Sequence, residues 1–484
     1  MSAFSERLNK YVDESGFSKN ALIAACQVNR STFFQCLNGK RLPTDEFFET
    51  LLQALQLSPG EEGKLRKCYY IAQIGESVYR SRINAQRCLD TLASLSGEVL
   101  PQIYQFKGET QLTTPHAPLQ GENQVYQELC HLVRAEMFLP EPKIDLFLPQ
   151  NSRSFFEYLK ALYRGSGEKV VRLRQLVQFA QKKGEKTKDS LEFFSSILFF
   201  LASNCTGYEA YYYYTEADFS NAVGVLYPYS VITSTGVLLL NEKMDRGLFS
   251  TAPDILSACR CQFEDAIRES KQFYTPFLGY KQTVEFALDH WSGSCARYQY
   301  FATPCFGMYL TDEILERYCP AGMEKIVYEY FNRVKAGQDY TSFCCERGLM
   351  RFARDGIMDE YPIGLIPPLN PEDRVAILKE MLYRRPKNAR LYLIDENKQA
   401  ISDEFVFSLS KGKRISSYRR AMPKLRMYCF QEQNLLDAFM DYFEALTQSK
   451  YVLPQSEVER VLYKAIVCAN SYCTHGEDHR AAPV

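Results

Sequence analysis

Apolar residues recur at helical spacing through the first 95 residues, and short polar breaks divide them into segments. In the first segment, Phe4, Leu8, Tyr11 and Val12 share one face of a helix. Cap residues mark the later segments, since Ser, Thr and Asn accept hydrogen bonds from the amides of a first turn and Gly ends a helix. The pattern predicts six short helices, which cover approximately residues 4–12, 18–25, 30–37, 45–55, 61–72 and 79–95.

A stretch rich in Gly, Pro, Thr and Gln, Lys107–Asn123, is interpreted as a linker. Beyond it, some apolar residues follow the helical period, and others lie in short runs of branched and aromatic residues that are typical of strands. Helices are predicted over 152–163, 170–181, 191–204, 253–267, 375–383 and 431–446. Strands are predicted over 143–148, 208–214, 225–233, 237–241, 390–394, 404–409, 414–418 and 426–429.

The order of elements in the last third of the chain resembles the order in the preceding region. In both, a helix and a strand are followed by two strand candidates around a glycine-containing turn, at Ser234–Gly236 and at Lys411–Gly412. The sequence identity between these regions is negligible, so the hypothesis of two similar α/β units rests on element order alone. An unrelated strand order in the two regions would contradict it.

Composition is typical of a globular protein. The 484 residues include 57 Lys plus Arg and 58 Asp plus Glu, so the formal net charge is −1. Hydrophobic residues make up 46%, which excludes a largely disordered chain, and the balanced charge excludes a histone-like protein. No signal segment, no apolar run of ~20 residues and no C-x-x-C among the 16 cysteines is present. We therefore expect a cytoplasmic protein with reduced thiols and no membrane partner.

Positive charge is concentrated in one segment, Ser18–Pro43, which contains no Asp or Glu. Its basic residues are Lys19, Arg30, Lys40 and Arg41. Acids occupy the flanking helices instead: Asp13, Glu14, Asp45, Glu46, Glu49, Glu61 and Glu62. A phosphate backbone binds such a surface because neutralised phosphates release their counterions.

The same segment has the apolar spacing of two helices joined by a short turn. Four of its residues are expected to join the helices or face the core: Leu22, Val28, Phe33 and Leu37. Arg30, Ser31 and Gln35 then remain on the outer face of the second helix, where a helix-turn-helix motif reads the major groove.

These residues resemble the lambda-repressor-like, or Xre-type, helix-turn-helix DNA-binding domains, over roughly residues 5–65. The match lies in Ser18, Lys19, Leu22, Ala25, Val28, Asn29, the run Arg30–Phe33, the run Asn38–Arg41, Pro43, Leu51, Leu55 and Leu57. The resemblance implies base contacts by Arg30, Ser31 and Gln35. It implies phosphate contacts by Lys19, Asn38, Lys40 and Arg41. One position departs from the family, because Leu37 stands where an acid often precedes Asn-Gly.

The rest of the chain resembles, more loosely, the effector regions of bacterial one-component regulators, in Tyr227–Tyr229, Phe352–Gly356 and Asp437–Phe443. We predict an all-α helix-turn-helix bundle followed by a larger mixed α/β region. The predicted domains are a DNA-binding domain over 1–66, a helical connector and linker over 67–122, and two α/β effector units over 123–290 and 291–484.

Together these expectations describe a bacterial transcriptional regulator that binds double-stranded DNA as a homodimer and senses an unknown small-molecule or peptide effector. Two alternatives stay open. The first is a scaffold whose N-terminal bundle binds a protein partner. The second is an enzyme in the C-terminal region, such as a cysteine hydrolase that uses Cys344 or Cys345 with His290. We expect no enzyme and no cofactor, because no recognisable acid–base pair or nucleotide motif is present.

Three further groups of residues have competing interpretations. Four consecutive tyrosines, Tyr211–Tyr214, place two rings on each face of a strand. These rings either pack in a core or contribute to a ligand pocket formed by Tyr212, Tyr214, Trp291 and Tyr298.

The acid-free basic run Lys411–Arg426 is either an anion site or the solvated face of a hairpin. No metal site is expected from the C-terminal cluster, which lacks standard zinc spacing: Cys468, Cys473, His475 and His479.

Overall fold

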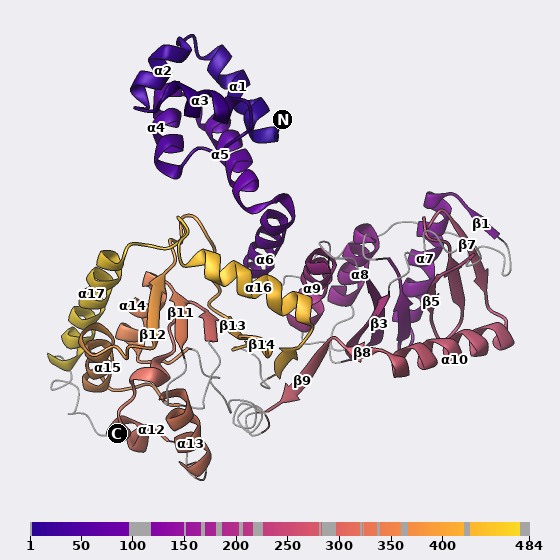
Figure 1. Ribbon diagram of the computed structural model, residues 1–484. Coiled ribbons are helices and arrows are strands. Elements are labelled where there is room, and N and C mark those ends of the chain that lie inside the picture. Colours follow the sequence, from indigo (N-terminus) through magenta and orange to yellow (C-terminus); the bar gives the residue numbers. More distant parts are fainter. Residues whose placement is uncertain are drawn as a thin grey trace. The chain divides into compact units, whose positions relative to one another are not determined.

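The computed structural model divides the chain into two compact units, residues 1–83 and 84–484. The first unit is helical, and the second combines helices with two mixed β-sheets (Figure 1). The structure describes residues 2–95, 118–149, 152–165, 170–180, 186–202, 207–215, 226–279, 282, 297–319, 322, 324–335, 339–359, 366–420 and 426–474.

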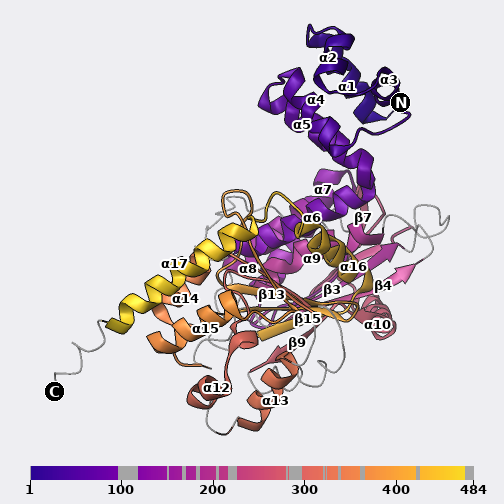
Figure 2. The same cartoon turned by 60° about the vertical axis from the view of Figure 1, so that its left-hand side comes forward.

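Short helices pack around one core in the first unit (Figure 2). They are α1 (Ala3–Glu14), α2 (Lys19–Ala25), α3 (Arg30–Leu37), α4 (Asp45–Leu55) and α5 (Pro59–Ile74). α6 (Glu76–Ser94) follows, and its residues Ala85, Cys88 and Leu89 belong to the core of the second unit. The predicted helices are confirmed, and so are their caps, since Asn29 Oδ1 accepts from the amide of Thr32 at 2.7 Å and Ser18 caps α2 in the same way. In the core, the rings of Phe48 and Tyr69 stack with centroids 3.9 Å apart.

The first sheet of the second unit contains β1 (Pro118–Gln120), β2 (Lys143–Phe147), β3 (Arg172–Ala180), β4 (Tyr208–Thr215), β5 (Tyr229–Ile232), β6 (Val237–Leu240), β7 (Arg246–Ser250) and β8 (Lys271–Gln272). Its order is β1-β7-β6-β5-β2-β3-β4-β8, with β2, β3 and β4 parallel. The associated helices are α7 (Glu122–Met137), α8 (Arg153–Gly165), α9 (Lys186–Ala202) and α10 (Pro253–Glu269).

The second sheet contains β9 (Tyr274–Leu278), β10 (Arg297–Tyr300), β11 (Tyr340–Cys344), β12 (Ala389–Leu393), β13 (Phe405–Ser410), β14 (Arg414–Arg419) and β15 (Arg426–Phe430). Its order is β12-β11-β10-β13-β14-β15-β9, with β10, β11 and β12 parallel. The associated helices are η2 (Phe306–Tyr309), α12 (Asp312–Tyr318), α13 (Glu324–Lys335), α14 (Glu346–Asp355), α15 (Pro371–Tyr383), α16 (Gln433–Leu446) and α17 (Gln455–Thr474).

The two sheets have the same strand order. Written from the first strand of each, it is β1-β7-β6-β5-β2-β3-β4 in one sheet and β9-β15-β14-β13-β10-β11-β12 in the other. In both, the chain returns after three parallel strands to pair antiparallel with the first of them, and an antiparallel meander follows. Among the described strands, β8 alone has no counterpart. This result agrees with the hypothesis of two similar α/β units.

The helix predicted over 170–181 is wrong, because Arg172–Ala180 forms β3. This strand lies between β2 and β4 and is buried on both faces, with Val177 and Phe179 on one face and Leu176 on the other. A strand buried on both faces has no clean alternation of polar and apolar residues, so its sequence resembles that of a buried helix. The predicted linker over 107–123 lies mostly outside the described residues, and its last part forms β1 and the start of α7.

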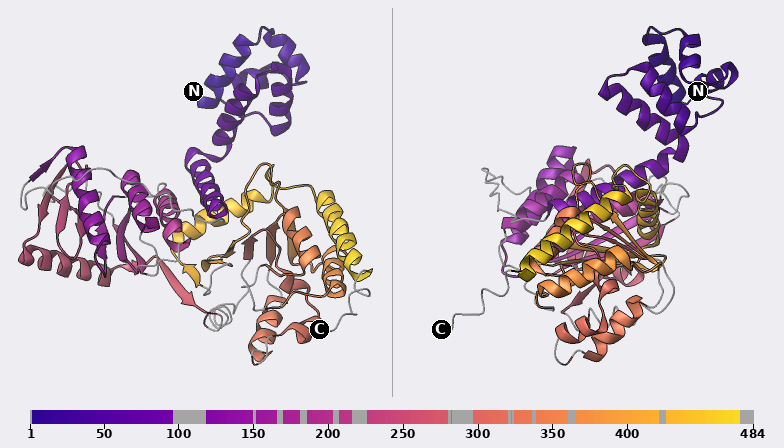
Figure 3. Two further views of the ribbon diagram at one scale, coloured as in Figure 1. Left: turned by 180° about the vertical axis from the view of Figure 1, so that it is seen from behind. Right: turned by 90° about the vertical axis from the view of Figure 1, so that its left-hand side faces the viewer.

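Helices cover both faces of each sheet. In the first sheet, α7, α8 and α9 cover one face and α10 lies along the other (Figure 3). In the second, α16 covers one face, and α14, α15 and α17 cover the other. One hydrophobic core joins α9, α16 and the facing sides of both sheets, where the ring centroid of Phe194 lies 5.0 Å from Phe430 and 5.7 Å from Phe439.

Candidate nucleic-acid interface

Apolar side chains that point into the first unit hold α2 and α3 together. Leu22, Phe33 and Leu37 are at most 2% exposed, and Val28 packs against the same core from the connecting turn. In that turn, Gln27 has a φ of 51°, a left-handed conformation that reverses the chain between the helices. The predicted inward and outward faces of this helix pair are therefore correct.

The residues predicted to face DNA bases are exposed on α3. Arg30 begins the helix, and Ser31 and Gln35 are four residues apart, so they are neighbours on its outer surface. The Arg30 guanidinium lies 5.6 Å from the centre of the Phe34 ring, and this cation–π contact holds it beside the same surface. Asn38, a predicted phosphate contact, is the exposed C-cap of the helix.

The loop after α3 folds back onto that helix. The amides of Lys40 and Arg41 donate to the carbonyl oxygen of Gln35 at 2.9 and 3.3 Å, so both exposed basic side chains start next to the end of α3. Gly39 has a φ of 69°, and a Cβ at this position would lie 2.8 Å from Ser5 Oγ. The loop therefore requires glycine where it passes α1.

Leu37, the position that departs from the family pattern, does not leave a hydrophobic spot on the surface. Its side chain is 2% exposed within the core of the bundle. Its carbonyl oxygen accepts a hydrogen bond of 2.6 Å from Asn9 Nδ2, which ties the end of α3 to α1.

Several acids that flank the basic segment are engaged by other parts of the bundle. Glu49 and Glu62 both contact the Arg66 guanidinium, which lowers the pKa of Glu49. Asp45 accepts hydrogen bonds from Tyr69 at 2.9 Å and from a glutamine of α5 at 2.8 Å. These carboxylates are therefore held on the α4–α5 side of the bundle.

Three of the four basic residues in the segment have no carboxylate partner among the described residues. Within the described part of the chain, no ion pair involves Arg30, Lys40 or Arg41. Lys19 differs, because its Nζ lies 3.1 Å from the carboxylate of Asp13. The face around α3 and its loop thus carries uncompensated positive charge, as an anion-binding surface requires.

Of the residues suggested for a ligand pocket, Tyr212 and Tyr214 are neighbours on β4, with ring centroids 5.5 Å apart, and Tyr298 lies in the other sheet. Tyr212 and Tyr214 point into the core beside α9, where Tyr214 donates to Glu432. Tyr298 belongs to the second sheet and stacks on a phenylalanine of α16 at 5.6 Å. Trp291 lies outside the described residues. The three tyrosines with described positions therefore pack in a core, as the first of the two interpretations predicts.

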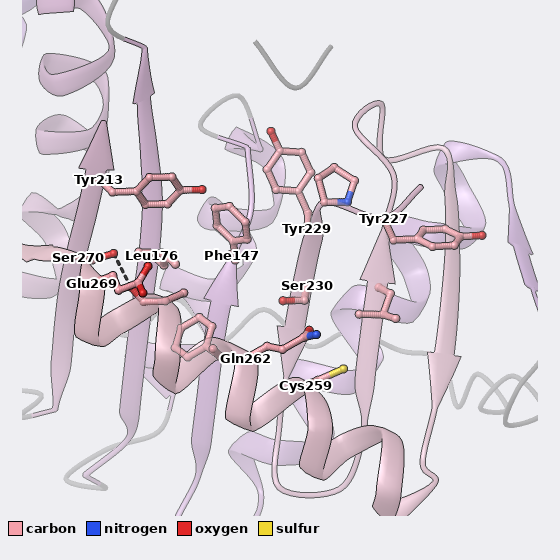
Figure 4. A pocket seen from close by; sticks show the side chains of 14 residues that line it. Phe147, Leu176, Tyr213, Tyr227, Tyr229, Ser230, Cys259, Gln262, Glu269 and Ser270 are labelled. Atoms are coloured by element: carbon pink, nitrogen blue, oxygen red, sulfur yellow. Dashed lines mark hydrogen bonds between the residues drawn. The ribbon is translucent and has the colours of Figure 1, made fainter. Parts of the chain in front are cut away.

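A different cavity of about 430 Å³ lies on the α10 side of the first sheet (Figure 4). Aromatic rings from β2, β4, β5 and the segment just before β5 line one side of it: Phe147, Tyr213, Tyr229 and Tyr227. On the other side, α10 contributes the ring of Phe263 together with smaller and polar side chains. The sequence contained two signals for this cavity. Two tyrosines flank Pro228 just before β5, and the inward side of α10 carries Cys259 and Ala266 where a core helix would carry large residues.

In the described part of the second basic run, several side chains pair with acids. Arg420 contacts the carboxylate of Asp359, which is fully buried. Arg419 pairs with Glu404 at 2.8 Å, and Lys411 lies 3.5 Å from a glutamate of α16. Acids outside the run therefore compensate these three of its basic side chains.

Buried thiols occupy the positions considered for a nucleophile. Cys344 and Cys345 are fully buried, and burial raises the pKa of Cys345 to about 12, so its thiolate does not form near neutral pH. His290, His475 and His479, the histidines considered with these and the C-terminal cysteines, lie outside the described residues. Among the residues with defined positions, no group of three or more His, Cys, Asp and Glu side chains could hold a metal ion.

No protein-family model matches the chain, and no curated protein matches it. In the described part of the chain, no helix combines the length and the apolar character of a membrane span. The function is therefore inferred from the site itself.

Proposed function

We propose that the N-terminal unit binds double-stranded DNA sequence-specifically and that the protein is a transcriptional regulator. The observation that carries this proposal is the uncompensated positive charge of Arg30, Lys40 and Arg41 around one exposed helix. Phosphates neutralise such a surface and release counterions on binding. The resemblance to Xre-type helix-turn-helix domains supports the same function.

In this proposal α3 enters the major groove and presents its exposed face to base edges through Arg30, Ser31 and Gln35. The end of the helix and the loop contact phosphates through Asn38, Lys40 and Arg41. An arginine reads guanine best, because its two donors match the O6 and N7 acceptors. Lys19 contributes less than the loop cations, because Asp13 competes for its ammonium group.

The second unit supplies dimerisation and effector sensing, as in the cytoplasmic one-component regulators of bacteria that its sequence loosely resembles. A two-fold dimer places two recognition helices about 34 Å apart and selects a palindromic site.

Selection from a pool of random duplexes tests the proposal. The purified full-length chain is mixed with the pool, and the retained duplexes are sequenced. We expect an enriched inverted repeat. Arg30→Ala should lose the preference for guanine at one position of each half-site, whereas Lys64→Ala, which removes an exposed charge from α5, should enrich the wild-type motif.

Three results would overturn parts of this proposal. If no duplex is enriched over the input pool, the DNA-binding function is wrong, and the bundle is better explained as a protein-interaction module. If Arg30→Ala enriches an unchanged motif, α3 is not the reading helix. If the motif is a single site without repeat, DNA binding stands and the two-fold dimer does not.

A further inference from the structure

The cavity on the α10 side of the first sheet lies where the strand order of that sheet reverses. β2 is followed along the chain by β3 on one side, and it pairs with the returning strand β5 on the other. Phe147, the last residue of β2, and Tyr229, the first residue of β5, face each other at this point with ring centroids 5.4 Å apart. In open α/β sheets, ligands bind at the carboxyl ends of strands beside such a reversal.

Aromatic faces dominate the sheet side of the cavity. The ring of Tyr213 lies 6.3 Å from that of Phe147, and Tyr227, which is 39% exposed, lies on the outer side (Figure 4). The π-faces of such rings are negative and attract cations. A cation–π contact already exists beside the cavity, because the Arg174 guanidinium lies 5.2 Å from the centre of the Phe263 ring.

The charged groups that line the cavity favour the binding of a cation. Its described lining includes one acid, Glu269, and no Lys, Arg or His. The neighbouring Arg174 is held by Asp145 at 2.6 Å and by Glu264 at 2.7 Å, so these carboxylates offset its positive charge. The last turn of α10, from Ala266 to Ser270, also borders the cavity, and the C-terminal end of a helix carries partial negative charge.

The equivalent helix of the second sheet packs larger side chains against its sheet. α16 follows β15 as α10 follows β7, and it fills the groove over its sheet with Phe439, Tyr442 and Phe443. On α10 the inward residues are mostly small or polar, and among its described residues the buried ones are Leu256 and Phe263. Because the two sheets share their strand order, the cavity in the first sheet results from the side chains of α10.

We propose that this cavity binds a small organic cation, whose ammonium group lies against the rings of Phe147, Tyr213 and Tyr229 and near the carboxylate of Glu269. The volume of about 430 Å³ lies within the range of small-molecule sites. This site is distinct from the residues suggested by the sequence, and it does not depend on DNA binding.

Calorimetric titration of the full-length chain tests the proposal with two probes of equal shape. Choline carries a quaternary ammonium group, and 3,3-dimethylbutan-1-ol has a neutral carbon in its place. We expect choline to bind at least about tenfold more tightly, because cation–π and carboxylate attraction distinguish the two. Equal affinities, or no binding of choline, would overturn the assignment.

Variants locate the site. Tyr229→Leu should weaken choline binding about tenfold, and Tyr229→Phe should retain it, because the ring is kept. Glu269→Gln should weaken it several-fold without affecting folding, since Glu269 is exposed. Asp254→Asn, an exposed acid in the first turn of the same helix, is the matched control and should bind as the wild type does. Unchanged binding in both Tyr229→Leu and Glu269→Gln would place the cation elsewhere.

Discussion

Two basic runs in the chain, Ser18–Pro43 and Lys411–Arg426, both lack Asp and Glu but have different environments. In the first, the side chains of Arg30, Lys40 and Arg41 are exposed, and the described residues offer them no carboxylate partner. In the second, acids from distant segments meet the basic side chains, and Arg414 is 3% exposed. A local excess of basic residues therefore indicates a binding surface only when the fold brings no acids to it.

The second run illustrates why such acids are needed. Asp359 is fully buried after α14 and contacts Arg351 and Arg420. Burial of a charge without a partner costs several kcal/mol, so these arginines serve the stability of the second sheet. Among the described residues, no buried carboxylate contacts the N-terminal run, and its charges remain available to a ligand.

The largest expected effect is on stability and concerns the second run. Arg420→Met removes one of the two cations that contact buried Asp359, so we expect the second unit to lose about 3 kcal/mol of stability. Thermal unfolding followed by circular dichroism measures this loss. DNA affinity should stay unchanged in a band-shift assay at a temperature where the variant is folded. A fall in DNA affinity at unchanged stability would assign the second run to DNA as well.

The next effect concerns the first run. Arg30→Ala should weaken binding to a selected duplex by about 1–3 kcal/mol, while the stability of the bundle changes little because Arg30 is exposed. Fluorescence anisotropy with a labelled duplex gives the affinity. Arg30→Lys is the informative partner variant, since it keeps the charge but not the bidentate donors. Full specificity in Arg30→Lys would mean that Arg30 contacts phosphate and not a base.

A smaller effect on stability is expected from loss of the helix cap at Asn29, which stabilises α3 locally. Asn29→Ala removes the acceptor for the amide of Thr32, and we expect it to cost about 1 kcal/mol of stability in the first unit. Asn29→Asp keeps the acceptor and should keep the stability, as chemical denaturation would show. If Asn29→Ala unfolds at the wild-type denaturant concentration, the cap does not support α3.

The smallest effect is expected at the exposed end of the second run. Lys411 and Glu444 are 56% and 54% exposed and 3.5 Å apart, a geometry that contributes at most about 0.5 kcal/mol. Lys411→Ala should therefore leave both the unfolding temperature and DNA affinity at wild-type values. A measurable loss of DNA binding in this variant would weaken the contrast between the two runs.

Local signals made the N-terminal unit predictable. Helix caps such as Ser18 and Asn29 act within three residues, so the sequence is sufficient to place α2 and α3 and the exposed face that contains Arg30. The strand β3 was missed for the opposite reason. Its strand conformation depends on pairing with β2 and β4 and on helices that cover both of its faces, and these tertiary contacts leave no local signal in its own sequence.

The four tyrosines of β4 also show that the sequence of one strand does not predict what packs on each of its faces. Alternation along Tyr211–Tyr214 correctly predicted two rings on each face, with Tyr212 and Tyr214 on one side and Tyr213 on the other. The sequence of β4 does not indicate which face is hollow. That depends on α9, which fills one side with phenylalanines, and on α10, which leaves space on the other.

The salt dependence of DNA binding tests the central claim most directly. The dissociation constant of the full-length chain for its selected duplex is measured from low to high salt, for the wild type and for the double variant Lys40→Ala/Arg41→Ala. The proposed phosphate contacts predict that the double variant reduces the slope of log Kd against log salt by about two, and that Lys411→Ala keeps the wild-type slope. An unchanged slope in the double variant would contradict the proposed interface.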